Sequence, residues 1–166
     1  MKQIPLIFQP PIAALALGAA AAAGLLSAYI AQYGFGLQPC ELCLWQRGPY
    51  WVALVLTMVV ITSGRQAGVV PVCLLLLVLT WLTSAGLGVY HSGVEQHWWV
   101  HGGACGGGGA QALTPEMLRE QLLAMPVTRC DEISWTFLGL SMATWNIPFS
   151  LALAVFSGMT YAKNYR

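Results

Sequence analysis

Two cysteines and an arginine lie close together in the stretch QPCELCLWQR, residues 38–47. Residues three and four apart share one face of an α-helix, so a helix here places Cys40 beside Cys43 and Arg47 one turn beyond Cys43. Pro39 disfavours helix before it, which predicts that Cys40 and Glu41 lie in the first turn. The positive end of a helix dipole and a nearby cation both favour the thiolate, the reactive form of cysteine. The stretch therefore favours a redox-active pair.

An inert structural clip is the alternative interpretation of the same residues. In that case Arg47 would extend its guanidinium to lipid phosphate and the two cysteines would only fasten the chain. However, a disulfide between cysteines three residues apart closes a very short loop and stabilises a fold little by chain entropy. Redox pairs are often built with this spacing.

Long apolar runs must position these residues. The chain has 166 residues, of which 57% are hydrophobic and 8% charged, and a mean hydropathy of +0.66, which is typical of a membrane protein. A membrane-spanning helix needs about 20 apolar residues to cross roughly 30 Å of hydrocarbon. We therefore expect an all-α, four-transmembrane-helix bundle, a single integral membrane domain over residues 1–166, with helices at about 11–31, 43–63, 69–90 and 143–161. A short first outer loop, about 32–42, and a long second one, about 91–142, complete it.

The first apolar run also resembles a secretory signal, because Lys2 precedes an alanine-rich segment. The run is longer than the apolar core of a usual signal peptide, and three further spans follow it. We therefore interpret it as the first helix.

The placement of charge predicts the orientation in the membrane. With four spans, both termini lie on one side, and that side carries Lys2, Arg65, Lys163 and Arg166 and no acidic residue. By the positive-inside rule this side is cytoplasmic. The acids Glu95, Asp131 and Glu132 are then most simply part of a solvated outer surface.

Four of the five cysteines fall in the two outer segments: Cys40, Cys43, Cys105 and Cys130. An even number of cysteines in an oxidising compartment suggests disulfides, and four cysteines allow three pairings. Cys73 lies within the third apolar run and is interpreted as a small buried hydrophobic residue.

Glycines surround Cys105 in the stretch GGACGGGG, residues 102–109. They allow many backbone conformations, so we expect a mobile segment whose sulfur can meet a protein partner. A phosphate-binding loop is not supported, because no Gly-Lys-Ser/Thr sequence follows. A zinc site built from the cysteines with His91, His97 and His101 is a further alternative, although structural zinc ligands usually have compact spacing on a rigid frame.

The motifs CELCLWQRGPY, YHSGVEQHWW and RCDEISWTFLGLSMATWN, with a cysteine in the glycine-rich stretch, resemble the disulfide bond formation protein B (DsbB) family of the bacterial inner membrane. The resemblance covers all four spans and both outer loops. It implies a thiol:quinone oxidoreductase that reoxidises a DsbA-like periplasmic thiol oxidoreductase and passes two electrons to ubiquinone or menaquinone.

The resemblance also implies roles for individual residues. Cys105 would form the mixed disulfide with the partner protein, and Cys130 would resolve it. Cys40 and Cys43 would form the second pair, with Cys43 as the thiolate beside the quinone, and the resting pairs would be 40–43 and 105–130. Arg47 matches a quinone-contacting arginine of the family, and His91 matches a residue lining that site.

Three function classes follow. The first is this oxidoreductase, in the inner membrane with both termini cytoplasmic and the cysteine loops periplasmic, binding lipid and no nucleic acid and requiring no metal. The second is a non-enzymatic four-span scaffold whose outer loop is stapled by disulfides. The third is a metal-binding membrane protein.

Overall fold

The computed structural model describes residues 5–63, 68–99, 129–133 and 135–166. Four long helices dominate these ranges: α1 (Pro10–Tyr29), α2 (Glu41–Thr62), α3 (Val69–Glu95) and α5 (Met142–Tyr165). A short 3-10 helix, η1 (Leu6–Phe8), precedes α1, and a π-helical segment, η2 (Ile30–Gly34), follows it directly. Two short strands, β1 (Thr136–Phe137) and β2 (Leu140–Ser141), precede α5.

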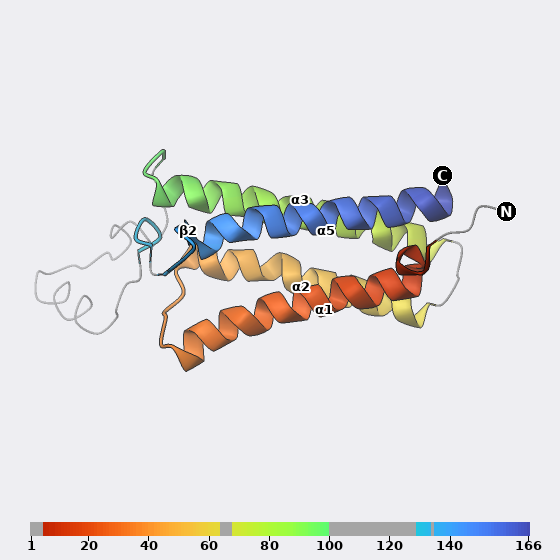
Figure 1. Ribbon diagram of the computed structural model, residues 1–166, viewed down its shortest axis with the longest axis horizontal. Helices are drawn as coiled ribbons and strands as arrows, with labels where there is room; N and C mark the ends of the chain where they lie inside the picture. Colours follow the sequence, from red (N-terminus) through yellow and green to blue (C-terminus); the bar gives the residue numbers. More distant parts are fainter. Residues whose placement is uncertain (1–4, 64–67, 100–128, 134) are drawn as a thin grey trace, which may run out of the picture.

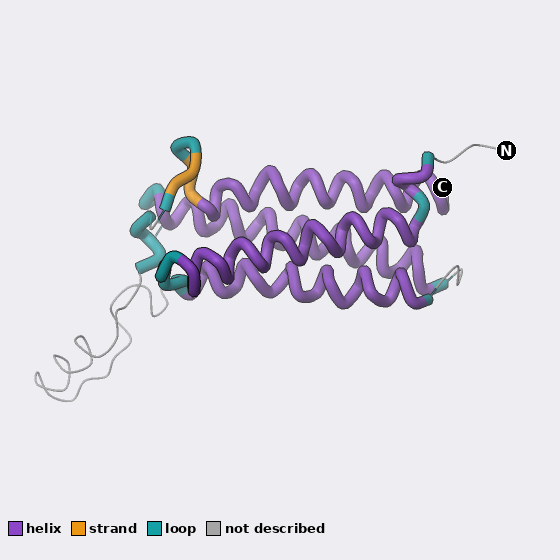
Figure 2. Tube along the Cα trace, turned by 60° about the horizontal axis from the view of Figure 1, so that its bottom comes forward, coloured by secondary structure: helices purple, strands orange, loops and turns teal. Residues whose placement is uncertain are grey.

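The four helices lie side by side in a bundle, as Figures 1 and 2 show. The closest partners are α3 with α5, α1 with α2, and α2 with α3. Both η1 and the end of α5 lie at one end of the bundle, where Asn164 Nδ2 donates to the Phe8 carbonyl at 2.7 Å. The connection from α1 to α2, the end of α3 and the two strands lie at the opposite end (Figure 1), which we call the cysteine end.

Each of three helices begins with a residue suited to that position. Pro10 and Pro11 occupy the first turn of α1, where the missing N–H removes no helical hydrogen bond. Cys40 caps α2, because its Sγ accepts a hydrogen bond from the Cys43 backbone N–H at 3.3 Å. Ser141 caps α5 in the same way through the Thr144 N–H at 3.1 Å.

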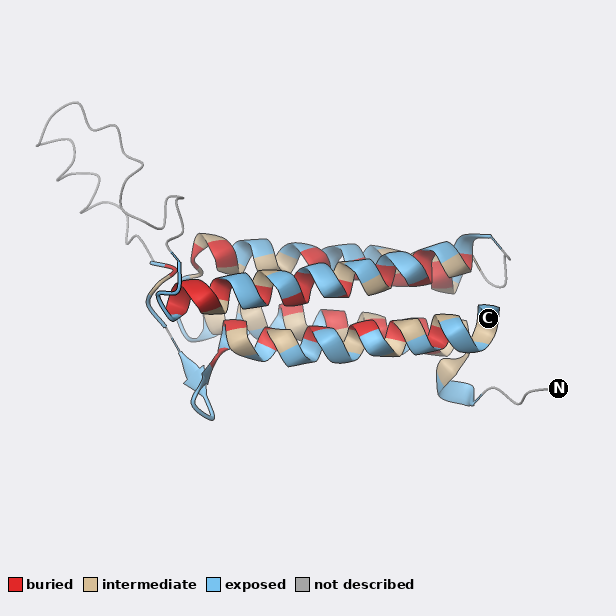
Figure 3. Ribbon diagram, turned by 90° about the horizontal axis from the view of Figure 1, so that it is seen from above, coloured by how far each residue is buried: buried red, intermediate tan, exposed pale blue. Residues whose placement is uncertain are grey.

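All four helices are long and apolar enough to cross a membrane. Buried residues face the interior of the bundle and exposed ones face outward, as Figure 3 shows. Many of the exposed residues are large and apolar, for example Leu26, Val55, Leu79 and Val155. Because lipid is the solvent for such a surface, the fold is that of a multi-pass membrane protein.

A polar network crosses the bundle interior at the level of Asn146. The Asn146 side chain accepts a hydrogen bond from Tyr50 Oη and donates to the Ser84 carbonyl at 3.2 Å. Ser150 Oγ donates to Ser84 Oγ at 2.9 Å. These contacts join α2, α3 and α5, so the buried polar groups satisfy one another away from water.

The strands form a tight hairpin at the cysteine end. Thr136 pairs with Ser141 and Phe137 with Leu140, and the two residues between the strands, Leu138 and Gly139, both have positive φ, at 52° and 79°. Two consecutive residues with positive φ are the signature of a type I′ turn.

Three expectations about helix ends were wrong. The last helix, α5, continues to Tyr165, four residues beyond its predicted end. The third helix continues five residues beyond the predicted end, to Glu95, so His91 lies in a helix and not in the second outer loop. Cys40 is the N-cap of α2 and not part of its first turn, since its backbone is extended, with ψ of 172°. The predicted mobile segment around Cys105 lies outside the described residues.

Candidate active site

The two cysteines at the start of α2 lie in direct contact. Their Sγ atoms are 3.0 Å apart, with the Cys40 thiol donating to Cys43, and neither forms a disulfide with another residue. Cys40 is buried and Cys43 is half-buried. The hydrogen bond to Cys43 and burial both raise the pKa of the Cys40 thiol, so Cys40 holds its proton more tightly than a free thiol does.

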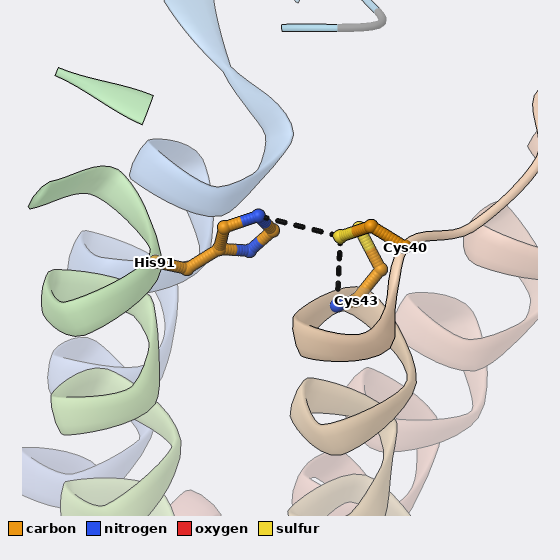
Figure 4. A group of neighbouring side chains, drawn as sticks. All are labelled: Cys40, Cys43 and His91. Atoms are coloured by element: carbon orange, nitrogen blue, oxygen red, sulfur yellow. Dashed lines mark hydrogen bonds between the residues drawn. The ribbon is translucent and has the colours of Figure 1, made fainter. Parts of the chain in front are cut away.

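A histidine and a carboxylate from α3 approach the same pair. His91 Nε2 lies 3.5 Å from Cys40 Sγ, as Figure 4 shows, and Glu95 Oε1 lies 3.9 Å from His91 Nε2. The Ser141 hydroxyl, at the start of α5, donates to Glu95 Oε2. Cys40, His91, Glu95 and Ser141 are all buried, so three helix ends contribute to one enclosed polar cluster.

Arg47 is held by α1 and η2. Its Nη1 donates to Gln32 Oε1 at 2.7 Å, and its guanidinium carbon lies 4.9 Å from the centre of the Tyr29 ring. Gln32 is thus the polar partner that the Arg47 cation requires at the membrane boundary. The π-helical segment η2 carries Gln32, and such segments are frequent at functional sites.

Cys130 lies beside the pair. It is 1% exposed and shares a buried cluster with Cys40, Leu42 and Val94. Its sulfur is in a disulfide bond, whose partner lies outside the described residues.

An ion pair lies on the exposed side of Cys130. Arg129 Nη2 contacts Asp131 Oδ2 at 2.6 Å, and the guanidinium holds the pKa of that carboxyl below its ordinary value.

A cavity of about 610 Å³ opens beside these residues, between α1, α2, α5 and the end of α3. Its polar wall includes Cys43, Gln46, Arg47 and His91. Most of the remaining lining is apolar or aromatic and includes Leu25, Leu37, Tyr50, Met142, Trp145 and Phe149. The volume and the apolar walls with a few convergent polar groups are typical of a small-molecule site.

The structure brings together five of the six site residues that the sequence predicts: Cys40, Cys43, Arg47, His91 and Cys130. The sixth, Cys105, lies outside the described residues. Cys73 is buried in the bundle core among apolar residues, away from the cluster.

The expectation for Glu95 was wrong. The sequence interpretation placed it on a solvated outer surface, but it is only 9% exposed and faces His91 and Ser141. The spacing of four residues from His91 was the available signal, because residues four apart share a helix face. Gln32, the partner of Arg47, had no comparable signal.

Comparison with known proteins places this geometry in context. The family described as "Disulfide bond formation protein DsbB" matches residues 10–160. A disulfide bond formation protein B of Methylococcus capsulatus is 33% identical over 144 residues, covering 82% of this chain and 84% of that protein. One of Xanthomonas oryzae pv. oryzae is 31% identical over 147 residues, covering 85% and 84%. An uncharacterized protein of Rickettsia prowazekii is 30% identical over 137 residues, covering 81% and 78%.

Proposed function

Since this chain belongs to the DsbB family and has a role in disulfide bond formation, we propose that it is a thiol:quinone oxidoreductase of the bacterial inner membrane. It reoxidises a DsbA-like periplasmic dithiol protein and delivers the two electrons to ubiquinone or menaquinone. The observation that carries this proposal is the contact between the Cys40 and Cys43 sulfurs, 3.0 Å apart, in the wall of a largely apolar cavity.

The pair is suited to reversible disulfide formation. Cys40 is the N-cap of α2 and Cys43 lies in its first turn, so the two sulfurs face each other. Closing a disulfide between them therefore requires little backbone movement. Cys40 retains the shared proton, and Cys43 therefore serves as the thiolate. We assign Cys43 as the sulfur that faces the electron acceptor, because it is the less buried of the two.

The cavity fits a quinone. A quinone has a flat ring with two carbonyl oxygens and a long apolar tail, and the lining offers aromatic walls with a few hydrogen-bond donors. Arg47 and Gln46 would hold the ring oxygens, and His91 would line the same site. When bound, the quinone supplies a two-electron, two-proton acceptor, which matches the oxidation of one dithiol to one disulfide.

Cys130 links the pair to the aqueous side. Its disulfide partner is proposed to be Cys105, the remaining cysteine of the five, and the buried cluster places Cys130 next to Cys40. In the proposed order, the partner protein's dithiol becomes a disulfide and reduces the Cys105–Cys130 bond. The reduced Cys105 and Cys130 thiols then reduce a Cys40–Cys43 disulfide by exchange. Electrons and protons are conserved at each transfer.

His91 is proposed to act on protons at Cys40. Disulfide exchange at the pair leaves a thiolate on one sulfur, and the imidazole lies within 3.5 Å of Cys40 Sγ. Glu95 Oε1 lies 3.9 Å from the same ring nitrogen, and the Ser141 hydroxyl holds that carboxylate in place.

We further propose that the whole chain is a single membrane domain with the cysteine end facing the periplasm. The dithiol partner is confined to water and the quinone to lipid, so exchange must occur at their boundary. All four candidate spans begin or end at the cysteine end of the bundle, which supports this placement.

The test is quinone reduction by the purified chain in detergent, with a short-chain ubiquinone and a reduced thioredoxin-like donor. We expect loss of oxidised quinone to require both Cys43 and Cys105. Cys43→Ser should still capture the donor as a mixed disulfide, whereas Cys105→Ser should not. Cys73→Ser is the matched control and should react normally, because Cys73 lies in the apolar core. Normal turnover in the Cys43→Ser variant, or dithiol oxidation independent of quinone, would contradict the proposal.

A further inference from the structure

Three ligand-type atoms converge at the cysteine end. Cys40 Sγ, Cys43 Sγ and a ring nitrogen of His91 all lie within 4.8 Å of one another. Figure 4 shows the two thiols at the start of α2 and the imidazole reaching toward them from α3. The two sulfurs belong to one helix terminus and the imidazole to a second packed helix, so the frame is rigid and compact.

This arrangement removes the main objection that the sequence raised against a zinc site, the lack of a rigid frame for the histidines. The histidines were expected in a loop beside the glycine tract, where no rigid frame would hold them. His91 instead lies in α3 and is 3% exposed. The proposed thiol chemistry uses the two cysteines as electron carriers and His91 for proton transfer, and neither role requires a metal ion.

We propose that the reduced Cys40–Cys43 pair and His91 form a binding site for Zn²⁺, with Glu95 beside it. Zinc prefers tetrahedral sulfur and nitrogen ligands at about 2.3 Å and about 2.0–2.1 Å, so sulfurs in such a site stand roughly 3.7 Å apart. The observed separations are 3.0 Å between the sulfurs and 3.5 Å between Cys40 Sγ and His91 Nε2. Rotation of the half-buried Cys43 side chain opens the pair by the small remaining amount.

The fourth position has a candidate ligand within reach. Glu95 Oε1 lies 3.9 Å from His91 Nε2, and the carboxylate is anchored through Oε2 by the Ser141 hydroxyl. Glu95 therefore completes the coordination or holds a zinc-bound water, as carboxylates beside metal-ligating histidines commonly do.

Charge favours a divalent ion here. Two thiolates neutralise the charge of Zn²⁺, so the ion and its two sulfur ligands together carry no net charge at the membrane boundary, where an unpaired charge is costly. Two arginines line the same cavity, but Arg47 is engaged by Gln32 and Tyr29, and Arg129 is paired with Asp131. Binding releases the thiol protons and transfers no electrons.

The site depends on the redox state of the pair. Once the two sulfurs form a disulfide, they are no longer thiolate donors, so oxidation and zinc binding exclude each other. If the proposed oxidoreductase function holds, Zn²⁺ keeps the pair reduced and blocks turnover, and a chelator restores it.

The binding test needs neither quinone nor partner protein, so its failure is distinguishable from failure of the proposed function. The protein is the full chain in detergent carrying both Cys105→Ser and Cys130→Ser, which removes the second cysteine pair. It is titrated with Zn²⁺ in competition with a chromophoric chelator. We expect one ion per chain when Cys40 and Cys43 are reduced and none when the same chain is oxidised. Co²⁺ should give the visible absorption of tetrahedral thiolate coordination.

Single substitutions resolve the ligands. Cys43→Ser should abolish tight binding, and His91→Gln should weaken it about tenfold or more, because the variant loses the nitrogen ligand. Cys73→Ser is the matched control and should leave affinity unchanged. Equal binding by the oxidised chain, or unchanged affinity in His91→Gln, would overturn the site. The comparison of the reduced and oxidised states uses one and the same protein. It therefore does not depend on whether the ligand variants fold.

Discussion

At the start of α2, the sulfur of Cys40 both caps the helix and belongs to the proposed redox pair. It accepts the Cys43 backbone N–H and donates to Cys43 Sγ. Serine is among the best N-cap residues, whereas alanine offers no acceptor. The two roles of the sulfur can therefore be separated by substitution.

We expect Cys40→Ser and Cys40→Ala both to lose quinone reduction by about a thousandfold or more, because the disulfide cannot form. They should differ in stability. Cys40→Ser should unfold near the wild-type midpoint in a detergent titration with sodium dodecyl sulfate, and Cys40→Ala should be less stable by about 1 kcal/mol. Equal midpoints for the two variants would show that the cap contributes nothing.

Arg47 reaches the cavity from a position fixed by Gln32 and Tyr29. Lysine keeps the charge but lacks the planar fork that suits a carbonyl oxygen and an aromatic face. We expect Arg47→Lys to raise the KM for quinone about tenfold, or roughly 1.4 kcal/mol, with a smaller change in kcat. Steady-state rates at varied quinone concentration measure this.

Gln32→Leu is the companion variant, because it removes the partner of Arg47 without changing the charge. It should raise the same KM to a lesser degree. A KM unaffected by either change would place the quinone elsewhere.

At the residue scale, the sequence indicated the positions of the predicted site residues better than it indicated their surroundings. The spacing of Cys40, Cys43 and Arg47 was sufficient to place them at one helix terminus. Glu95 was misinterpreted because a single acid at the end of an apolar run resembles a surface residue. Only the packing of α5 against α3, which brings Ser141 to Glu95, shows that it is buried.

At the scale of elements, the contact between α3 and α5 depends on small residues. A Cβ on Gly88 would lie 2.9 Å from Ile147 Cγ1 and 3.2 Å from the Ala143 carbonyl oxygen. Gly86, two residues earlier on the same helix, has nothing within 4 Å of such an atom. The pair therefore forms a matched test of helix packing.

We expect Gly88→Ala to destabilise the bundle by about 1–3 kcal/mol, because the methyl group must push the helices apart. Gly86→Ala should be neutral or slightly stabilising, since alanine favours a helix over glycine. The unfolding midpoint in the same detergent titration reports both. Similar destabilisation by the two substitutions would refute a close contact at Gly88.

The helix count followed from the sequence, but the helix ends did not. Apolar run length predicts where hydrocarbon is crossed, so four spans were correctly expected. A helix can continue past the apolar run when polar side chains find partners, and His91 and Glu95 do so at the end of α3. The π-helical turn of η2 has no marker in the sequence that we recognised.

At the scale of the whole molecule, the bundle has two different ends. The cysteine end carries the proposed redox pair, Cys40 and Cys43, and the cavity, and the other end carries η1 and the last turn of α5 with Lys163. Separation of the two ends by the length of the helices is what a protein acting at one membrane surface requires.

We expect the end of α5 to lie in the cytoplasm. A fluorescent protein that matures only in the cytoplasm, fused after Arg166, should be bright, and alkaline phosphatase fused at the same position should be inactive. The reverse result would invert the proposed topology and place the cysteine end away from its periplasmic partner.

In the proposed function, Cys40 and Cys43 pass their electrons directly to a quinone. The most direct measurement is a single turnover of the reduced Cys105→Ser, Cys130→Ser chain with ubiquinone and no partner protein. We expect one quinone reduced per chain, with a Cys40–Cys43 disulfide detected by peptide mapping. Quinone left oxidised while the pair stays reduced, in a chain shown to be folded, would contradict the claim.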